Sequence, residues 1–336
     1  MNHKASEIIR TLLPGYFAFV MATGIVASGL NAFGYGTIAR VLFVLGILGY
    51  LKLWVLSICR VVRYPVDMWA DFTSFSRGPG FFTTVAGTGI LGAVAIRLYD
   101  STVIAFGLLC FDAVLWFVMS YLFATVVVVS AEKPTAERGV NGGWLVIVVA
   151  TQSLSVLSAL LNDRIPLFIP VALFVTGCAT YLLLISLIVS RLILTKVDVA
   201  DLAPPYWIMM GAASISCLAG VELNKHSATW GLNVNAFPVL QAVTLFFWIV
   251  ATGWIPLLVC LGVWRHVIKR APLGYEPQLW SIVFPLGMYA FATFSVSEYF
   301  KLPFIEPIAS TFLAIACLAW VIVLCGMLRS AYRVIR

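Results

Sequence analysis

Apolar residues along this chain form long runs instead of the short alternating stretches that are typical of β-sheet proteins. A helix that crosses a bilayer needs about 20 apolar residues, and a window of that length predicts ten such helices. They cover residues 13–33, 38–59, 79–97, 103–130, 143–161, 166–190, 204–223, 236–264, 279–297 and 304–328. The pattern predicts an all-α integral membrane protein in which residues 1–336 form a single transmembrane domain.

Small and bulky residues alternate from one predicted helix to the next. The odd-numbered helices begin after proline or glycine and are rich in Gly, Ala, Ser and Thr, whereas the even-numbered helices are longer and rich in Leu, Ile, Val, Phe and Trp. Small residues let helix backbones approach closely in lipid, and bulky side chains suit a lipid-facing surface. This division predicts an inner ring of five helices within an outer ring of five.

The odd-numbered helices also align with one another as a repeat. An aromatic residue near the start of each helix sets the register: Tyr16, Phe81, Trp144, Tyr206 and Trp280. The chain is therefore expected to form five hairpins that point the same way, a parallel repeat, at about 13–59, 79–130, 143–190, 204–264 and 279–328. Five helices rich in small residues enclose an axis too wide for them to fill, which favours a pore. A tightly packed bundle without a pathway is the alternative.

Charge sets the expected orientation. Only 10% of the residues are charged and 62% are hydrophobic, whereas soluble domains are about 25% charged. Of the 21 basic residues, 15 lie on the side of the N terminus, Lys52 lies within a helix and five lie on the opposite side. Basic residues favour the cytoplasmic side, so we expect a multi-pass protein of the plasma (inner) membrane with both termini cytoplasmic. The net charge of +7 then reflects this topology and contact with membrane lipid. No nucleic-acid partner is expected, because the sequence has no stripe of basic residues on a soluble element.

Three stretches of the sequence resemble a known membrane family. PGYFAFVMATGIVA (14–27), PPYWIMMGAASIS (204–216) and WSIVFPLGMYA (280–290) are similar to the family that joins the bacterial tellurite-resistance protein, the fungal malate and sulfite transporters and the plant slow anion channels, within the voltage-dependent anion channel superfamily. The resemblance runs over nearly the whole chain, although the helices at 81–97 and 143–161 match more loosely. It implies a homotrimer in which each protomer has its own pore, made by five kinked inner helices.

The resemblance also implies a gate on the ninth helix, where a phenylalanine in a Phe-Pro context occludes the pore. The matching residue is Phe284, followed by Pro285 and Gly287 in a run without charge. Proline in a helix interior costs about 3 kcal/mol or more, and broken helices at membrane depth are tolerated where they line a cavity. Counting four residues from each aromatic anchor places Phe284 in one layer with Val20, Val85, Val148 and Met210. If this layer faces the axis, the ring closes it; ordinary packing of Phe284 is the alternative.

Hydroxyls, and not carboxylates, are the polar groups of the predicted pore. The inner helices contain no Asp or Glu before Glu222 and Glu298 at their outer ends, whereas cation pathways commonly use acidic rings or carbonyl cages. An uncharged lining with a basic mouth favours anions, and the resemblance implies small inorganic or dicarboxylate anions. The hydroxyl candidates are Thr23, Thr88, Thr151 and Ser214, with Thr83, Thr84, Ser153 and Ser216 beside them. Hydrogen bonding between helices is their alternative role.

Two ionisable residues, Lys52 and Asp112, lie deep within even-numbered helices. Charges at that depth cost several kcal/mol unless they are paired or hydrated. Their depths differ by about 6 Å at the helical rise of 1.5 Å per residue, so we expect a buried ion pair between hairpins or at a trimer interface. Attraction of anions by Lys52 or proton transfer by Asp112 is the alternative. The three histidines are scattered, so no metal or other cofactor is expected.

These observations predict a gated channel or transporter for small anions, and the resemblance implies that C4-dicarboxylates such as malate are among them. A proton-coupled dicarboxylate carrier or a sulfite or tellurite exporter is the alternative, because the resemblance covers both behaviours. An integral membrane enzyme is a remote alternative. Chemistry within a bilayer usually needs clustered His, Asp, Glu or Cys at one depth, and the intramembrane charges here are one lysine and one aspartate.

Overall fold

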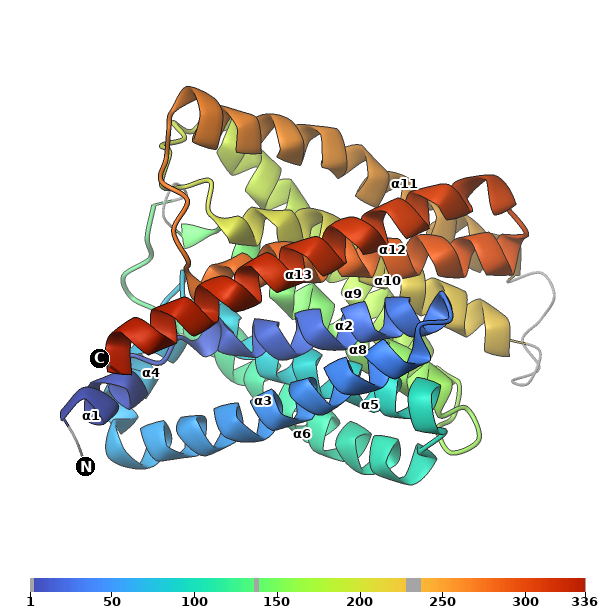
Figure 1. Cartoon of the computed structure of the whole chain (residues 1–336), viewed down its shortest axis with the longest axis horizontal. Coiled ribbons are helices and arrows are strands. Elements are labelled where there is room, and N and C mark those ends of the chain that lie inside the picture. The colour runs from blue at the N-terminus through green and yellow to red at the C-terminus, as the bar shows by residue number, and fades with distance from the viewer. Residues whose placement is uncertain (1–2, 136–138, 228–236, 336) are drawn as a thin grey trace.

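The computed structural model describes residues 3–135, 139–227 and 237–335, and contains no strand within them. Ten of the described helical segments are long and apolar enough to cross a membrane, in agreement with the sequence pattern (Figure 1). Counted along the chain from one to ten, the odd-numbered membrane helices are those labelled α2 (Ala18–Ala32), α5 (Phe82–Tyr99), α8 (Val146–Leu160), α10 (Ile208–His226) and α12 (Trp280–Phe300). The even-numbered helices are α3 (Gly36–Arg63), α6 (Thr102–Val129), α9 (Phe168–Leu194), α11 (Phe237–Val263) and α13 (Glu306–Ile335).

The two sets of helices differ sharply in burial. In the odd-numbered helices, between 72% and 94% of the most apolar window is buried inside the molecule, against 17% to 33% in the even-numbered helices. The odd-numbered helices are therefore inner helices and the even-numbered ones outer helices. Because small side chains allow close backbone approach while bulky ones can face lipid, residue size along the chain is enough to separate the two sets.

The five inner helices contact one another in a closed cycle. α2 packs against α5, α5 against α8, α8 against α10, α10 against α12, and α12 returns to α2. A 3-10 turn precedes each helix, and these five turns contact one another in the same cyclic order. The turns are Pro14–Phe17, Gly78–Phe81, Gly142–Leu145, Pro204–Trp207 and Pro277–Leu279.

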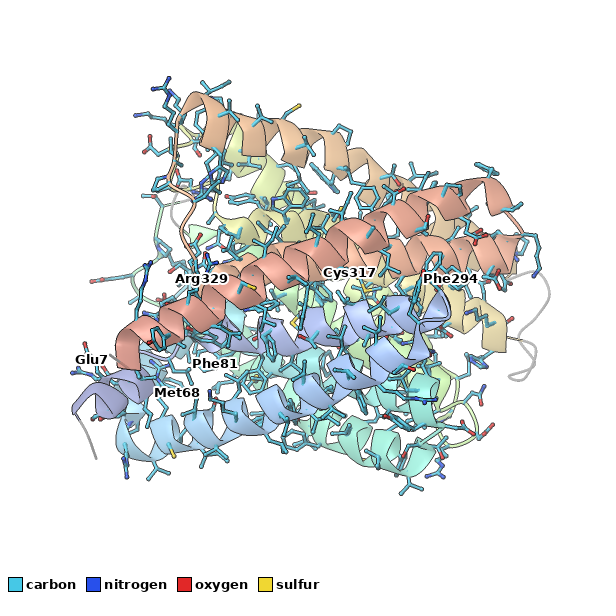
Figure 2. All side chains as sticks on the ribbon, in the orientation of Figure 1. Glu7, Met68, Phe81, Phe294, Cys317 and Arg329 are labelled. Atoms are coloured by element: carbon cyan, nitrogen blue, oxygen red, sulfur yellow. The ribbon has the colours of Figure 1, made fainter. Side chains whose placement is uncertain are left out.

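The first turns all lie at one end of the molecule. Helix α1 (His3–Arg10) and the last turns of α13 lie at this end too (Figure 1). We call this end the N side and the opposite end the far side. Among the side chains labelled in Figure 2, Glu7 and Phe81 lie towards the N side and Phe294 towards the far side.

Proline and glycine explain why the inner helices can start so close together. Proline suits a first helical turn because the N–H that it lacks has no intrahelical partner there. The third inner helix uses Asn141 instead, whose side chain accepts a hydrogen bond of 2.8 Å from the backbone N–H of Gly143. A Cβ atom on Gly142 would lie 2.6 Å from the carbonyl oxygen of Pro205. Glycine at position 142 is therefore required for the third and fourth turns to touch.

Each outer helix is hydrogen-bonded to the inner helix of the next hairpin. In every hairpin an aromatic side chain of the outer helix, a tyrosine or a tryptophan, forms this hydrogen bond. The outer helix of the last hairpin bonds to the inner helix of the first. The five contacts are Tyr50 Oη to Thr88 Oγ1 (2.8 Å), Trp116 Nε1 to Thr151 Oγ1 (2.9 Å), Tyr181 Oη to the Met209 carbonyl (3.2 Å), Trp248 Nε1 to Thr293 Oγ1 (3.0 Å) and Trp320 Nε1 to Thr23 Oγ1 (3.0 Å). We call these five contacts the outer-to-inner hydrogen bonds; they fasten the hairpins into a ring.

Thr151→Val is expected to destabilise the protein by about 1–3 kcal/mol, because it leaves the indole N–H of Trp116 without its acceptor. Thermal unfolding of the detergent-solubilised protein measures the loss as a lowered Tm. Adding Trp116→Phe should recover part of it, because both polar partners are then gone. Ser214→Ala is the matched control, since the Ser214 hydroxyl bonds only to the Met210 carbonyl of its own helix in the described structure. Equal Tm values for Thr151→Val and Ser214→Ala would contradict a fastening role.

Candidate functional site

Three cavities lie in succession from the N side to the far side. The first, the N-side cavity, has a volume of about 380 Å³ and is lined by all five first turns of the inner helices. One residue from each turn marks its wall: Gly15, Gly80, Gly143, Pro205 and Gln278. The N-side cavity is therefore centred on the cycle that the inner helices form.

The second, the axial cavity, is enclosed by the same five helices further along. Its volume of about 10 Å³ is close to the minimum that one water molecule needs. Each inner helix contributes to its wall, with Ile25, Ile90, Ser153, Ile215 and Met288 as one residue from each. The axis is thus nearly filled at this level.

The third, the far-side cavity, has a volume of about 430 Å³ and a strongly charged wall. Arg97 lines both this cavity and the axial cavity. The other charged groups of the far-side wall are Glu222, Lys225, Glu298 and Lys301.

A seven-residue spacing links the N-side and axial cavities on four of the inner helices. One residue lines the N-side cavity, and the residue two helical turns later lines the axial cavity. The pairs are Thr83 and Ile90, Val146 and Ser153, Ile208 and Ile215, and Ser281 and Met288. Because seven residues are close to two turns of an α-helix, each pair marks a stripe that faces the axis.

Phe284 lies on the stripe of α12, three residues after Ser281 and four before Met288. Residues at these spacings share a helix face. The Phe284 side chain is only 1% exposed. α12 continues through Pro285 without interruption, and a Cβ atom on Gly211 of α10 would lie 2.8 Å from Pro285 Cγ. Gly287 faces α2, where an added Cβ would lie 3.0 Å from Ile25 Cγ2.

The other members of the layer predicted from the repeat are buried. Val20, Val85, Val148 and Met210 are each 0% exposed. Val20 packs between α2 and α5, since a Cβ atom on Gly87 would lie 3.5 Å from Val20 Cβ. Val20 therefore contributes to the contact between two neighbouring inner helices.

Three of the four main hydroxyl candidates face the outer ring. Thr23, Thr88 and Thr151 take part in the outer-to-inner hydrogen bonds, so their hydroxyls are directed away from the axis. Ser214 donates to the carbonyl of Met210 on its own helix. Among the further candidates, Thr83 lines the N-side cavity and Ser153 the axial cavity. The repeat pattern located hydroxyl-rich helices but could not say which face of each helix they occupy.

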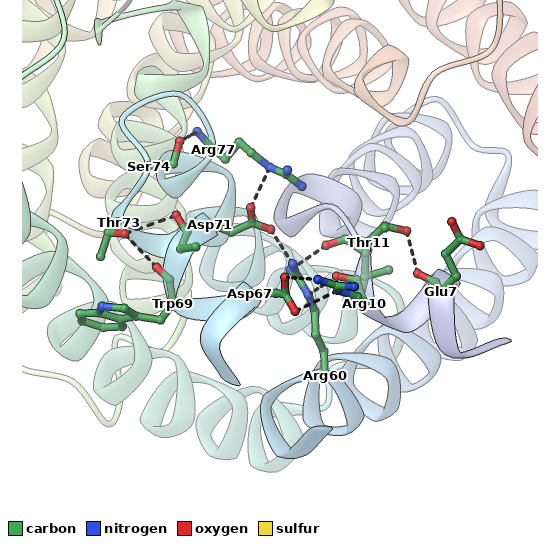
Figure 3. Close-up of polar contacts among 12 residues, drawn as sticks. Glu7, Arg10, Thr11, Arg60, Asp67, Trp69, Asp71, Thr73, Ser74 and Arg77 are labelled. Carbon is green, nitrogen blue, oxygen red and sulfur yellow. Dashed lines mark hydrogen bonds and ion pairs between the residues drawn. The ribbon is translucent and has the colours of Figure 1, made fainter. Parts of the chain in front are cut away.

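Ion pairs surround the N-side cavity, and a short helix that the sequence pattern did not predict supports them. Helix α4 (Pro65–Thr73) carries Asp71, which accepts a hydrogen bond of 2.6 Å from Arg60 and lies 3.1 Å from Arg77 of the cavity wall (Figure 3). Asp67 of the same helix accepts hydrogen bonds from Arg10 of α1. The hydrogen bond and charge of Asp67 raise the pKa of Arg10 above its ordinary value.

A second arginine of the N-side wall is held in a similar way. Arg191 lies 3.2 Å from Asp201, donates to the Val140 carbonyl at 3.1 Å and contacts the Tyr206 hydroxyl. Asp201 and Tyr206 line the cavity together with Arg191. The N-side cavity therefore has two fixed arginines in its wall, each beside a carboxylate.

At the far side, Arg97 and Glu222 form an ion pair of 3.2 Å, although 125 residues separate them in sequence. Both are largely buried, with side-chain exposures of 15% and 5%. Lys225 lies 3.6 Å from the same carboxylate, and the Arg97 guanidinium lies 4.9 Å from the centre of the Phe291 ring. The sequence analysis placed Glu222 at the outer end of an inner helix and gave Arg97 no role, because only the folded ring brings them together.

The expected ion pair between Lys52 and Asp112 does not form within the described part of this single chain. Lys52 is exposed on the outer face of α3, whereas Asp112 is 0% exposed and neither of its oxygens has a hydrogen-bond partner. Lys52 lies on a helix face directed outwards and Asp112 on a face directed into the molecule, so the two side chains do not meet. Among the described residues, no group of three or more His, Cys, Asp and Glu could hold a metal ion.

Comparison with known proteins decides the family. A family model described as voltage-dependent anion channel matches residues 11–328, a range that includes the inner ring and all three cavities. The chain belongs to the voltage-dependent anion channel family. Its membership places the ring, with its cavities and charged ends, in a family of membrane anion channels and transporters.

Relatives of this member of the voltage-dependent anion channel family are membrane proteins too. A protein of Mycobacterium tuberculosis named an uncharacterized membrane protein is 38% identical over 143 residues, which cover 43% of this chain and 72% of the relative. Two proteins of Methanocaldococcus jannaschii named uncharacterized transporters are 23% and 22% identical. Their matches cover 96% and 97% of this chain, and 96% and 95% of theirs.

Proposed function

We propose that the chain is a gated pathway for small anions along the axis of the inner ring, closed at Phe284. The observation that carries the proposal is the stripe on α12, on which Phe284 stands between a residue of the N-side cavity and a residue of the axial cavity. A hydrophobic constriction between two cavities can gate a pore by excluding water. The 1% exposure of the ring fits a closed state.

The same stripes indicate which residues surround the phenyl ring of Phe284. The position level with Phe284 on another inner helix lies three residues after the N-side cavity residue, or four residues before the axial cavity residue. These positions are Ala86 on α5, Val149 on α8, Gly211 on α10 and Met21 on α2. This layer is shifted by one residue from Val20, Val85, Val148 and Met210. Ala86 is small, and the space beside Gly211 is taken by Pro285 of α12. We propose that the small side chain of Ala86 leaves room on the axis for one aromatic ring, that of Phe284.

The electrostatics of the N-side cavity favour anions. Each helix N-terminus carries a partial positive charge of about half an elementary charge, and five of them surround this cavity. Helix N-termini at membrane depth suit anionic substrates, and Arg77 and Arg191 add full charges to the wall. The excess of basic residues on the N side supports the orientation in which this cavity and both termini face the cytoplasm.

The family resemblance supports the finer parts of the proposal. We propose small inorganic anions and C4-dicarboxylates such as malate as the transported species, and a homotrimer in which each protomer has its own pathway. The outer helices present many exposed apolar side chains, which suit both lipid and a neighbouring protomer. Lys52 lies on this outward surface, on α3.

Flux into lipid vesicles tests the proposed function. The purified protein is reconstituted, and the uptake of chloride, nitrate, malate and sulfite is measured with and without a pH gradient. Uptake above that of protein-free vesicles, driven by the anion gradient alone, is the expected result. Uptake that follows the proton gradient would instead favour a coupled carrier. Flux that follows the cation gradient would contradict an anion pathway.

Asp201→Asn is expected to raise the preference for anions over cations, because it frees Arg191 of the N-side wall from its carboxylate partner. The shift of the reversal potential in a salt gradient measures the change. It should shrink at 1 M salt, where the Debye length is about 3 Å. Asp198→Asn is the matched control, since Asp198 pairs at the exposed surface with Lys196. An equal shift in both variants would contradict a role of the cavity wall in selectivity.

A further inference from the structure

Asp112 is a carboxyl group in an unusual position within the fold. It lies on the outer helix α6, which packs against the inner helices α5 and α8. The residue is 0% exposed, and neither carboxyl oxygen has a hydrogen-bond partner among the described residues. A buried ionised carboxylate without partners is strongly unfavourable. A carboxyl group in such a place is stable when a proton is bound to it, or when polar groups nearby connect it to water.

A glycine stands between this carboxyl and the axial cavity. A Cβ atom on Gly89 of α5 would lie 3.1 Å from Asp112 Oδ2 and 2.8 Å from Ser153 Oγ of α8. Gly89 and Ser153 both line the axial cavity. The missing side chain at position 89 therefore lets the carboxyl approach the wall of the axis from the outer ring, beside the hydroxyl of Ser153.

The titratable groups on the elements around Asp112 leave it without an ionic partner. From α3, the phenol of Tyr50 interacts electrostatically with it, while Lys52 is exposed on the outer surface. From α5, Arg97 is paired with Glu222, and Tyr99 lies at the far-side end of the helix. α8 contains no titratable residue. The two acids of α4, Asp67 and Asp71, are paired with arginines at the N side.

We propose that Asp112 is a proton-binding site in the wall of the axial pathway, open to it through the gap at Gly89. With a proton bound, the carboxyl is neutral and can donate a hydrogen bond towards Ser153. With the proton released through the axial cavity, the carboxylate places a negative charge beside the path of the anions. Like charges repel strongly where water is scarce, so the ionised form raises the barrier to anion passage.

The proton site itself is tested by infrared spectroscopy of the full-length wild-type protein in lipid vesicles. A protonated carboxyl has a C=O stretching band that ionised carboxylates lack. The expected result is a band in the wild type at neutral pH that is absent from Asp112→Asn, an isosteric variant. Glu222→Gln is the matched control, because it removes a second largely buried carboxyl, one that is paired with Arg97, and it should leave the band unchanged. A spectrum of Asp112→Asn that retains the wild-type band would overturn the proposal.

The effect on transport rests on the proposed function and is measured separately. Chloride flux is recorded from acidic to alkaline pH in Phe284→Ala, in which the proposed gate is removed, and in Phe284→Ala with Asp112→Asn. We expect flux to fall as the pH rises in the first variant and to stay high at every pH in the second. The same pH dependence in both would overturn the link between Asp112 and anion passage. Absence of flux in both would overturn the proposed gate, and the infrared result would still decide the proton site.

Discussion

The Phe284→Ala variant is expected to carry a standing anion conductance well above that of the wild type. The substitution removes the phenyl ring that we place between the N-side and axial cavities, and the neighbouring layer contains the small residue Ala86. Water can then enter the constriction, and an anion need not lose its hydration there. Each reduction of the barrier by about 1.4 kcal/mol raises a rate about tenfold, so an increase of about tenfold or more is expected.

Planar bilayer or oocyte recordings measure this conductance. Phe82→Ala is the matched control, because Phe82 is a fully buried phenylalanine at the start of an inner helix whose ring packs at 5.9 Å against Phe123 of the outer helix α6. Both variants lose the same atoms, so their losses of packing are comparable. Only Phe284→Ala should conduct well above the wild type. A correctly inserted Phe284→Ala protein with wild-type current would remove Phe284 from the gate.

Arg97→Gln is expected to be the most destabilising single change at the far side. It leaves the buried carboxylate of Glu222 with a longer contact of 3.6 Å to Lys225 in place of the 3.2 Å pair with Arg97. Breaking a buried ion pair by removing one partner costs about 3–5 kcal/mol. The side chain of Arg97 also lines the axial cavity, so anion flux in the Phe284→Ala background should fall at the same time.

The Glu222→Gln change added to Arg97→Gln separates the two effects. Replacing both charges removes the uncompensated carboxylate, so the Tm of the double variant should recover towards that of the wild type while anion flux stays low. Arg40→Gln is the control, because Arg40 is an exposed arginine at the far-side start of α3 and its loss should leave the Tm unchanged. A Tm in the double variant below that of Arg97→Gln would contradict a stabilising pair.

Residue size and apolar length along the chain predicted which helices are inner and which are outer. Both properties can be determined for each helix separately, so they follow from the sequence without knowledge of how the helices pack. The rotation of each helix about its own axis could not be predicted in this way. Side chains of successive residues in an α-helix point about 100° apart, so an error of one residue in the register changes the direction that is assigned to a side chain. Val20 shows the consequence: the repeat register gave its depth, but its side chain packs towards α5.

The charged groups show the same limit. Depth suggested a pair between Lys52 and Asp112, yet α3 directs Lys52 outwards and α6 directs Asp112 inwards. The pair that does form, Arg97 with Glu222, joins the second and fourth hairpins and depends on closure of the whole ring. Thr23, Thr88 and Thr151 were recognised as hydroxyls of inner helices, but the aromatic partners that orient them lie on helices of other hairpins.

The return contact from α13 to α2 has a consequence for biosynthesis. Thr23 lies on α2 and its partner Trp320 lies on α13, which is made after the other four hairpins have been synthesised. Until α13 enters the bilayer, the first hairpin keeps an open seam that lipid or an assisting protein has to cover. Closure of the ring therefore has to wait until α13 has been translated.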